Sequence, residues 1–370
     1  MHSSFDLTKS TISNSARSIC LAAFISVFPL LADGANAKPT LKETVLQHLA
    51  VQKKQRCDYR SHLRTRPAPV RNVDLVSQNK KMFKNAEQYA GYMHANATRY
   101  FFGGDTNAGK NAINLAVEWA QASAHESVSS PYKSYSSARY PTYMVIGSTL
   151  NALFLLDANP HLDDNRRAVI WGWTDKLVKK SYITRELPRG RAGNPEFEQR
   201  VNNHNGRRAT ILAYYAAHKN DQGLLRRSNK WAKRSFAKIK SGVMYDAIRG
   251  DWALNYSNLG IAALVEHTAF YGIVANDSDR NAKIRNINSA AQFLFRETLQ
   301  PNQIHQYAKV NSGRGGGSYG GKQVVWWNKR HTNGLTHYAW IDTGLLFEQP
   351  PLSLPAPRYS EIGGYSNCWF

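Results

Sequence analysis

The sequence predicts an all-α fold, an (α/α) toroid in which outer helices cover an incomplete barrel of inner helices. Helical periodicity dominates the chain, and strand-like alternation is scarce. The helical segments are also of two kinds. Segments 211–217 and 261–273 are apolar on almost every side, as expected for buried helices. Segment 224–240 instead has an apolar stripe that includes Trp231 and a basic face opposite, which is typical of an outer helix.

Nine helices follow from this periodicity, and clusters of Gly, Pro, Asn and Asp separate most of them. In chain order, the first five cover about residues 41–55, 79–101, 109–123, 143–156 and 163–182. The last four cover about residues 205–219, 224–240, 256–273 and 280–295. Between them, the Arg-rich segment 184–200 is predicted to be a loop over a cleft. The Gly-rich segment 313–321 is either a lid or a plain flexible connection.

Residues 1–37 are predicted to be a secretion signal. Lys9 and Arg17 precede an apolar run at 19–32, and residues 35–37 read Ala-Asn-Ala, which fits a cleavage site. The apolar run is too short to span a bilayer comfortably, and an uncleaved anchor is the alternative. We therefore expect a protein that is periplasmic or secreted.

The remaining segment, 38–370, is long enough to bury a large core, and we expect a single-domain monomer. None of its apolar stretches has transmembrane length, so no membrane span is expected after signal cleavage. Removal of the leader leaves Cys57 and Cys368, one near each end. In an oxidising compartment these two are expected to form a disulfide, and two unpaired thiols are the alternative.

The charge balance indicates an anionic partner. The chain has 48 Lys and Arg against 26 Asp and Glu, a net charge of +22. Such a field concentrates anions and speeds their capture. Nucleic acid would suit the same field, but an exported protein more often meets acidic polysaccharide. We therefore expect an anionic polysaccharide as partner and no nucleic acid.

Two short motifs carry the chemical groups of a candidate active site. Residues 200–204 read Arg-Val-Asn-Asn-His, and residues 249–258 read Arg-Gly-Asp-Trp-Ala-Leu-Asn-Tyr-Ser-Asn. In this order and spacing they resemble motifs of the alginate lyase family in the broad sense, which are mostly helical polysaccharide lyases. The resemblance runs from about residue 80 to about residue 275. Arg207 stands where many members have Trp, which leaves the preferred substrate open.

The resemblance implies the same toroid fold and a lyase that cleaves a 4-linked polyuronate, such as alginate or glucuronan, without metal or cofactor. Such an enzyme must neutralise the C6 carboxylate, remove the C5 proton and protonate O4. Asn203 and His204 are expected just before the helix that starts near residue 205, where backbone N–H groups favour an anion. Asn203 would donate to the carboxylate, and His204 would accept the C5 proton or bind the carboxylate. Alternatively, Asn202 and Asn203 simply cap the helix.

Tyr256 is expected to protonate O4, and also to act as the base if both atoms lie on one face of the sugar. A phenol with a reference pKa of about 10 needs a nearby cation for base work. Arg249, seven residues earlier, is expected to supply it and to bind the uronate. A buried core position is the alternative for Tyr256. Expected contacts to neighbouring sugars are Asn202, Arg207, Arg208, Lys133, Tyr132 and Tyr135.

Two rival functions remain open at this stage. A glycoside hydrolase on the same fold would use two carboxylates, and Asp251 and Glu266 are the first candidates. Neither belongs to a recognisable acidic pair. A non-catalytic protein that binds acidic polysaccharide would explain the positive charge equally well, but would not require His204 and Tyr256 to converge.

Overall fold

The computed structural model describes most of the chain from residue 38 onward. The described residues are 38–53, 65–74, 80–129, 139–186, 201–247, 253–299, 359–360 and 364–369. Residues from Pro39 onward belong to one compact unit. Within the described ranges, no helix is both long enough and apolar enough to cross a membrane.

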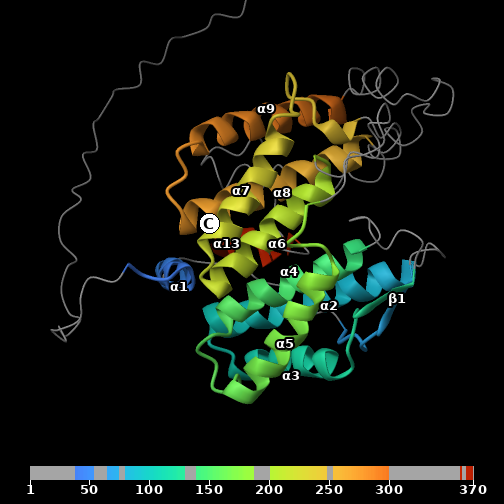
Figure 1. Cartoon of the computed structure of the whole chain (residues 1–370), viewed down its shortest axis with the longest axis vertical. Helices are drawn as coiled ribbons and strands as arrows, with labels where there is room; N and C mark the ends of the chain where they lie inside the picture. Colours follow the sequence, from blue (N-terminus) through green and yellow to red (C-terminus); the bar gives the residue numbers. More distant parts are fainter. Residues whose placement is uncertain are drawn as a thin grey trace, which may run out of the picture. The chain divides into compact units, whose positions relative to one another are not determined.

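All nine predicted helices are present (Figure 1). The first five are α1 (Leu41–Gln52), α2 (Lys80–Gly103), α3 (Thr106–Gln121), α4 (Tyr140–Leu155) and α5 (Asp164–Lys180). They are followed by α6 (Asn203–Lys219), α7 (Gln222–Phe236), α8 (Ala253–Val274), α9 (Arg280–Leu299) and the short α13 (Ser366–Trp369). Strands β1 (Asn72–Asp74) and β2 (Ser127–Ser129) pair in parallel, whereas β3 (Tyr359–Ser360) and β4 (Gly364–Tyr365) pair antiparallel.

Capping residues decide where the helices begin. Asp105, Asp163, Asn202 and Asp221 each precede a helix and accept a hydrogen bond from an amide of its first turn. Helix α4 instead has Pro141 in its first turn. Helices α4 and α6 therefore start three and two residues earlier than hydrophobic periodicity alone predicts, and α8 also starts three residues earlier. This difference matters because it brings candidate site residues into the first turns of these helices.

Helices α2, α4 and α6 lie side by side and run in the same direction. Early in α2 and α4, the rings of Phe83 and Tyr140 are 5.9 Å apart. Further along both helices, the Tyr89 hydroxyl lies 2.9 Å from Thr149 Oγ1. Helix α4 meets α6 in the same order, since Tyr140 contacts His204 at the two beginnings. Toward the other end, the Leu150 carbonyl lies 2.8 Å from a ring nitrogen of His218.

Helix α8 continues this parallel set beside α6. A Cβ added to Gly206 would lie 3.0 Å from the Cβ of Ala263, so glycine allows the two backbones to approach closely. Four residues later, the Thr210 hydroxyl donates to the Ala263 carbonyl at 3.2 Å. Because α2, α4, α6 and α8 are parallel neighbours, their N-termini lie at the same end of the bundle.

The remaining long helices form the outer layer predicted from the sequence. Short connections join α2 to α3, α4 to α5, α6 to α7 and α8 to α9, and each pair packs together. Every residue of α4 is buried, and so is segment 260–271 of α8. In α7, by contrast, burial follows one stripe that includes Leu225, Trp231 and Phe236. The layered arrangement of apolar inner helices and amphipathic outer helices is thus confirmed.

Candidate active site

The candidate site lies at the N-terminal end of the inner helices. Asn203 and His204 are the first two residues of α6 rather than residues preceding it. Asn202 is the N-cap, and its side-chain oxygen accepts a hydrogen bond from the Asn205 amide at 3.2 Å. Asn202 and Asn203 are buried, and His204 is half-buried. Capping therefore accounts for Asn202, whereas Asn203 and His204 sit in the first turn, beside the positive end of the helix dipole.

Parallel packing brings the second motif to the same end. The Cβ of Asn203 lies 3.8 Å from the position that a Cβ on Gly260 would occupy, so these two residues are neighbours. Tyr256 precedes Gly260 by one helical turn on the same face of α8, about 6 Å along the axis. Tyr256 is half-buried. The phenol, the amide and the imidazole therefore lie in the first turns of neighbouring helices although the two motifs are far apart in sequence.

An aromatic ring that the sequence analysis missed links His204 to Arg207. The Tyr140 ring meets the His204 ring edge to face, with centroids 4.9 Å apart. The Arg207 guanidinium lies over the Tyr140 ring at 5.4 Å, and Arg207 is only 1% exposed. Tyr140 escaped notice because the helix was expected to begin at residue 143. The neighbouring Pro141, which favours a first helical turn, was the signal that could have found it.

A buried carboxylate also lies close to Asn203. Asp246 Oδ2 is 3.2 Å from the same Cβ position on Gly260 that Asn203 approaches. Asp246 is 1% exposed. No sequence motif singles it out, and its only signal is that it directly precedes the second motif. Asn203 and Asp246 therefore both approach Gly260 of α8.

Further guanidinium groups give this end a positive potential. Arg139, directly before α4, lies over the Tyr182 ring at 5.1 Å, and Arg185 lies over the same ring at 5.7 Å. Burial lowers the pKa of Arg139 from its ordinary value, and the nearby Tyr143 and Tyr182 oppose that shift. Together with the helix N-termini, these cations favour an anionic ligand.

Arg208, which was expected to contact a sugar, is held by contacts inside the protein. It is 1% exposed, and one guanidinium nitrogen donates to the backbone carbonyls of Tyr182 and Arg185, each at 2.5 Å. Its guanidinium also stacks on Trp231 at 4.4 Å. Burial lowers the pKa of Arg208, and Tyr143 and Glu186 oppose the shift. Arg208 therefore fastens the segment after α5 to the beginning of α6.

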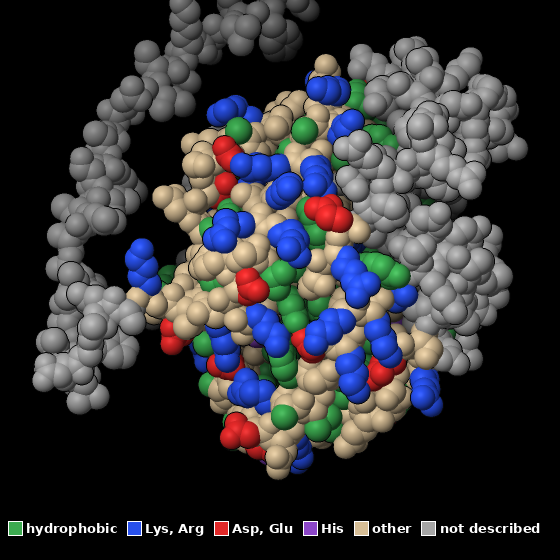
Figure 2. Space-filling view, viewed as in Figure 1, with side chains coloured by type: hydrophobic (Ala, Val, Ile, Leu, Met, Phe, Trp, Pro, Cys, Tyr) green, Lys and Arg blue, Asp and Glu red, His purple; other side chains and the backbone are tan. Residues whose placement is uncertain are grey.

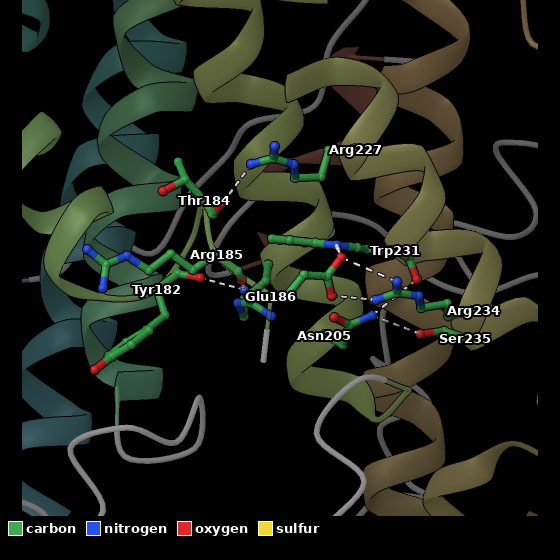
Figure 3. A network of polar contacts seen from close by, with 10 residues as sticks. Tyr182, Thr184, Arg185, Glu186, Asn205, Arg227, Trp231, Arg234 and Ser235 are labelled. Carbon is green, nitrogen blue, oxygen red and sulfur yellow. Dashed lines mark hydrogen bonds and ion pairs between the residues drawn. The ribbon is translucent and has the colours of Figure 1, made fainter. Parts of the chain in front are cut away.

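The same segment is held to α7 by a second set of contacts (Figure 3). Glu186 accepts a hydrogen bond from the Trp231 indole at 3.0 Å and pairs with Arg234 at 2.6 Å. Arg227 donates to the Thr184 carbonyl at 2.8 Å. Segment 182–186 is thus anchored on two helices, directly before the part of the chain that leads into the first motif.

We predict that Arg208→Leu lowers the free energy of unfolding by about 2 kcal/mol or more, because two backbone carbonyls lose their donor inside the protein. Arg227→Leu is the matched control. Arg227 is exposed and also donates to this segment, so its loss should cost less than about 1 kcal/mol. Urea unfolding of both variants measures the difference. Equal losses would contradict the anchoring role of Arg208.

Several expected residues fall outside the described ranges. These are Arg249, Lys133, Tyr132, Tyr135, Asp251, Cys57 and segment 313–321. Glu266, the other candidate acid of a hydrolase, is described and is 2% exposed. It lies ten residues beyond Tyr256 in α8, about 15 Å along the helix. Glu266 is therefore remote from the end where the candidate residues gather.

Comparison with known proteins agrees with the motifs. The sequence matches the alginate lyase family over residues 37–304. No curated protein matches the chain significantly. Among solved structures, alginate lyase A1-III from Sphingomonas species A1 is similar with a TM-score of 0.56 at 15% sequence identity. That likeness covers 89% of this chain and 97% of the other.

Two further structures of alginate lyase A1-III are complexed with a tetrasaccharide. One carries a histidine-to-alanine substitution; it has a TM-score of 0.61 and 15% identity, covering 89% of this chain and 96% of that one. The other carries a tyrosine-to-phenylalanine substitution, with a TM-score of 0.61 and 16% identity over 90% and 97% of the two chains. These likenesses confirm the predicted (α/α) toroid.

Proposed function

The chain belongs to the alginate lyase family and is a polysaccharide lyase, and from this premise we propose that it cleaves a 4-linked polyuronate by β-elimination without a metal or cofactor. The products would carry 4,5-unsaturated uronate ends. Polymannuronate and glucuronan are the substrates with which we would begin.

One observation carries this proposal: Asn203, His204 and Tyr256 lie in the first turns of α6 and α8, neighbouring helices whose N-termini are at the same end of the bundle. A non-catalytic binding protein would not need an imidazole and a phenol at one helix end. The relative offers a parallel, since its histidine-to-alanine and tyrosine-to-phenylalanine forms are complexed with a tetrasaccharide. A histidine and a tyrosine of this chain lie at the candidate site.

In the proposed mechanism, the Asn203 amide and the Arg249 guanidinium hold the C6 carboxylate, and the helix N-termini add to its stabilisation. Neutralisation makes the C5 hydrogen acidic enough for removal, and this electrostatic contribution should be the largest. His204 or Tyr256 takes the C5 proton. The C4–O4 bond then breaks, its electrons leave with O4, and Tyr256 supplies the proton that O4 needs.

We propose that Tyr132, Lys133 and Tyr135 contact the neighbouring sugars, with Asn202 and Arg207 as supporting residues. Arg207 is buried under Tyr140, so its action on substrate would pass through that ring and through its positive charge. The C5 epimer that is cleaved depends on the face of the sugar from which the base approaches, because epimers differ in the face that carries the C5 proton.

The test is a panel of purified polymannuronate, polyguluronate and glucuronan, followed by ultraviolet absorbance of the unsaturated product, with and without a chelator. We expect absorbance to rise on at least one uronan and to be insensitive to the chelator. New reducing ends without absorbance would indicate a hydrolase instead. Retention of the polymer with neither signal would indicate a binding protein.

We also propose that residues 1–37 are removed on export, that segment 38–370 is a monomeric domain in the periplasm or the medium, and that Cys57 and Cys368 form a disulfide. Cys368 is buried at 2% exposure, as a structural cysteine should be. The bridge would close a loop of about 300 residues, which by chain entropy stabilises the fold by roughly 5 kcal/mol at most.

We therefore predict that a thiol reductant lowers the melting temperature of the wild-type protein. The matched control is the double variant Cys57→Ser/Cys368→Ser, which should melt at the lower temperature with or without reductant. Titration of the unfolded, non-reduced wild-type protein would settle the pairing chemically. Two reactive thiols in that titration would rule the disulfide out.

A further inference from the structure

Helix α7 and the turn after it are strongly and uniformly basic. Residues 222–245 contain seven Lys and Arg and no Asp or Glu. The seven are Arg226, Arg227, Lys230, Lys233, Arg234, Lys238 and Lys240. Viewed as in Figure 1, the space-filling surface has many Lys and Arg side chains over the part of the face where α7 lies (Figure 2).

Three of these cations have structural partners. Arg227 donates to the Thr184 carbonyl, Lys233 pairs with Asp279, and Arg234 pairs with Glu186. The other four, Arg226, Lys230, Lys238 and Lys240, are exposed, and none pairs with a carboxylate among the described residues. We refer to these four residues as the α7 ridge.

The outer helix α5 shows the contrast. Its basic residues near the C-terminus have acidic partners, since Lys179 pairs with Asp175 and Lys180 pairs with Glu126. In the α7 ridge, Arg226 and Lys230 stand four residues apart on one helix, a spacing at which like charges repel. An anion bound along the ridge would relieve that repulsion.

The ridge begins beside the candidate active site. The Asn205 side chain, next to His204, donates to the Trp231 carbonyl at 3.1 Å and lies 3.4 Å from Ser235 Oγ. The C-terminal half of α7 therefore packs against the beginning of α6. Lys238 and Lys240 follow the C-terminal end of α7, and Arg226 and Lys230 lie about 6 Å apart along its axis, so a chain that leaves the site along α7 would pass successive cations of the ridge.

The surface chemistry favours a hydrated polyanion over a lipid surface. Helices that bind membranes expose apolar side chains opposite their charges. The apolar residues Leu225, Trp231 and Phe236 of α7 are instead buried in the protein. Among the described residues, the exposed large hydrophobic side chains are Val51 and Val169, which belong to α1 and α5.

We propose that the α7 ridge is a second binding surface for the anionic polysaccharide, outside the cleavage site, and this rests on the proposed function. A polyuronate carries a carboxylate on every sugar, so weak contacts along the ridge add up for a long chain. Binding there raises the effective concentration of the polymer at the adjacent site. A short oligosaccharide that fills only the site gains nothing from it.

The test compares Arg226→Gln/Lys230→Gln/Lys238→Gln with Lys38→Gln/Lys53→Gln/Lys110→Gln. Both variants lose three exposed positive charges, and only the first set lies on the ridge. Cleavage of a long uronan and of a tetrasaccharide is measured at low and high salt. For the ridge variant we expect kcat/KM on the polymer to fall roughly five- to tenfold at low salt. Its tetrasaccharide rate and its kcat should stay within about twofold, and salt should abolish the difference.

If kcat/KM on the polymer fell equally for both variants, the effect would be due to net charge and the proposal would be overturned. The proposal would also be overturned if the ridge variant lost as much activity on the tetrasaccharide as on the polymer, or if its cleavage of the polymer were unchanged. If the wild-type protein cleaves no uronan, the proposed function fails, and retention on immobilised uronan still tests the ridge separately. If the ridge variant lost binding to anionic vesicles or to nucleic acid but was still retained on immobilised uronan, the proposed role of the ridge would also be refuted.

Discussion

Tyr256→Phe is expected to lower kcat at least about a hundredfold, the effect typical of a lost acid–base group. The substitution removes one oxygen from a half-buried ring in the first turn of α8. The ring remains, so packing should be nearly unchanged and the variant should fold. Because the hydroxyl acts on atoms that change charge during the reaction, KM should change much less than kcat. The measurement is steady-state cleavage of a uronan with the melting temperature as a check on folding.

Tyr271→Phe provides the matched control for this variant. Tyr271 belongs to the same helix but lies fifteen residues further on, about 22 Å from Tyr256 along the axis. Its loss of one hydroxyl should leave kcat within about twofold of the wild type. Normal turnover by a folded Tyr256→Phe protein would remove Tyr256 from the mechanism.

The helices themselves could be predicted from the sequence because their apolar spacing is strong and local. Inner and outer helices differed in how many sides were apolar, and burial in α4 and α8 follows that difference. Their first residues were less predictable. Hydrophobic periodicity begins only where a side chain meets the core, whereas Asn202 and Pro141 start helices for capping and steric reasons.

The site was predictable only in part. Asn203, His204 and Tyr256 belong to motifs, and parallel packing of α6 and α8 puts the first turns that hold them at the same end of the bundle. Arg207 and Arg208 were expected to contact neighbouring sugars. Both are buried, and Arg208 binds carbonyls more than twenty residues away in sequence. Such a contact depends on where segment 182–186 returns to α6, which no local pattern specifies.

His204→Ala is the second substitution for which we expect a large loss, about a hundredfold or more in kcat if the imidazole accepts the C5 proton. His204 is half-buried in the first turn of α6 and rests against the Tyr140 ring at 4.9 Å. This contact fixes the ring while leaving part of it accessible to a sugar. The measurement separates kcat from KM on the preferred uronan, with the melting temperature as a folding check.

His204→Gln distinguishes the two roles that the imidazole can have. Glutamine can still donate a hydrogen bond to the uronate carboxylate, but it cannot accept a proton near neutral pH. If His204 is the base, the Gln and Ala variants should be equally slow, and added imidazole should restore part of the rate to the Ala variant. If His204 only binds the carboxylate, the Gln variant should keep most of its kcat and the Ala variant should change mainly in KM. In that case Tyr256 has to remove the C5 proton as well as protonate O4, which requires both atoms to lie on the same face of the sugar and so restricts the substrate to one C5 epimer.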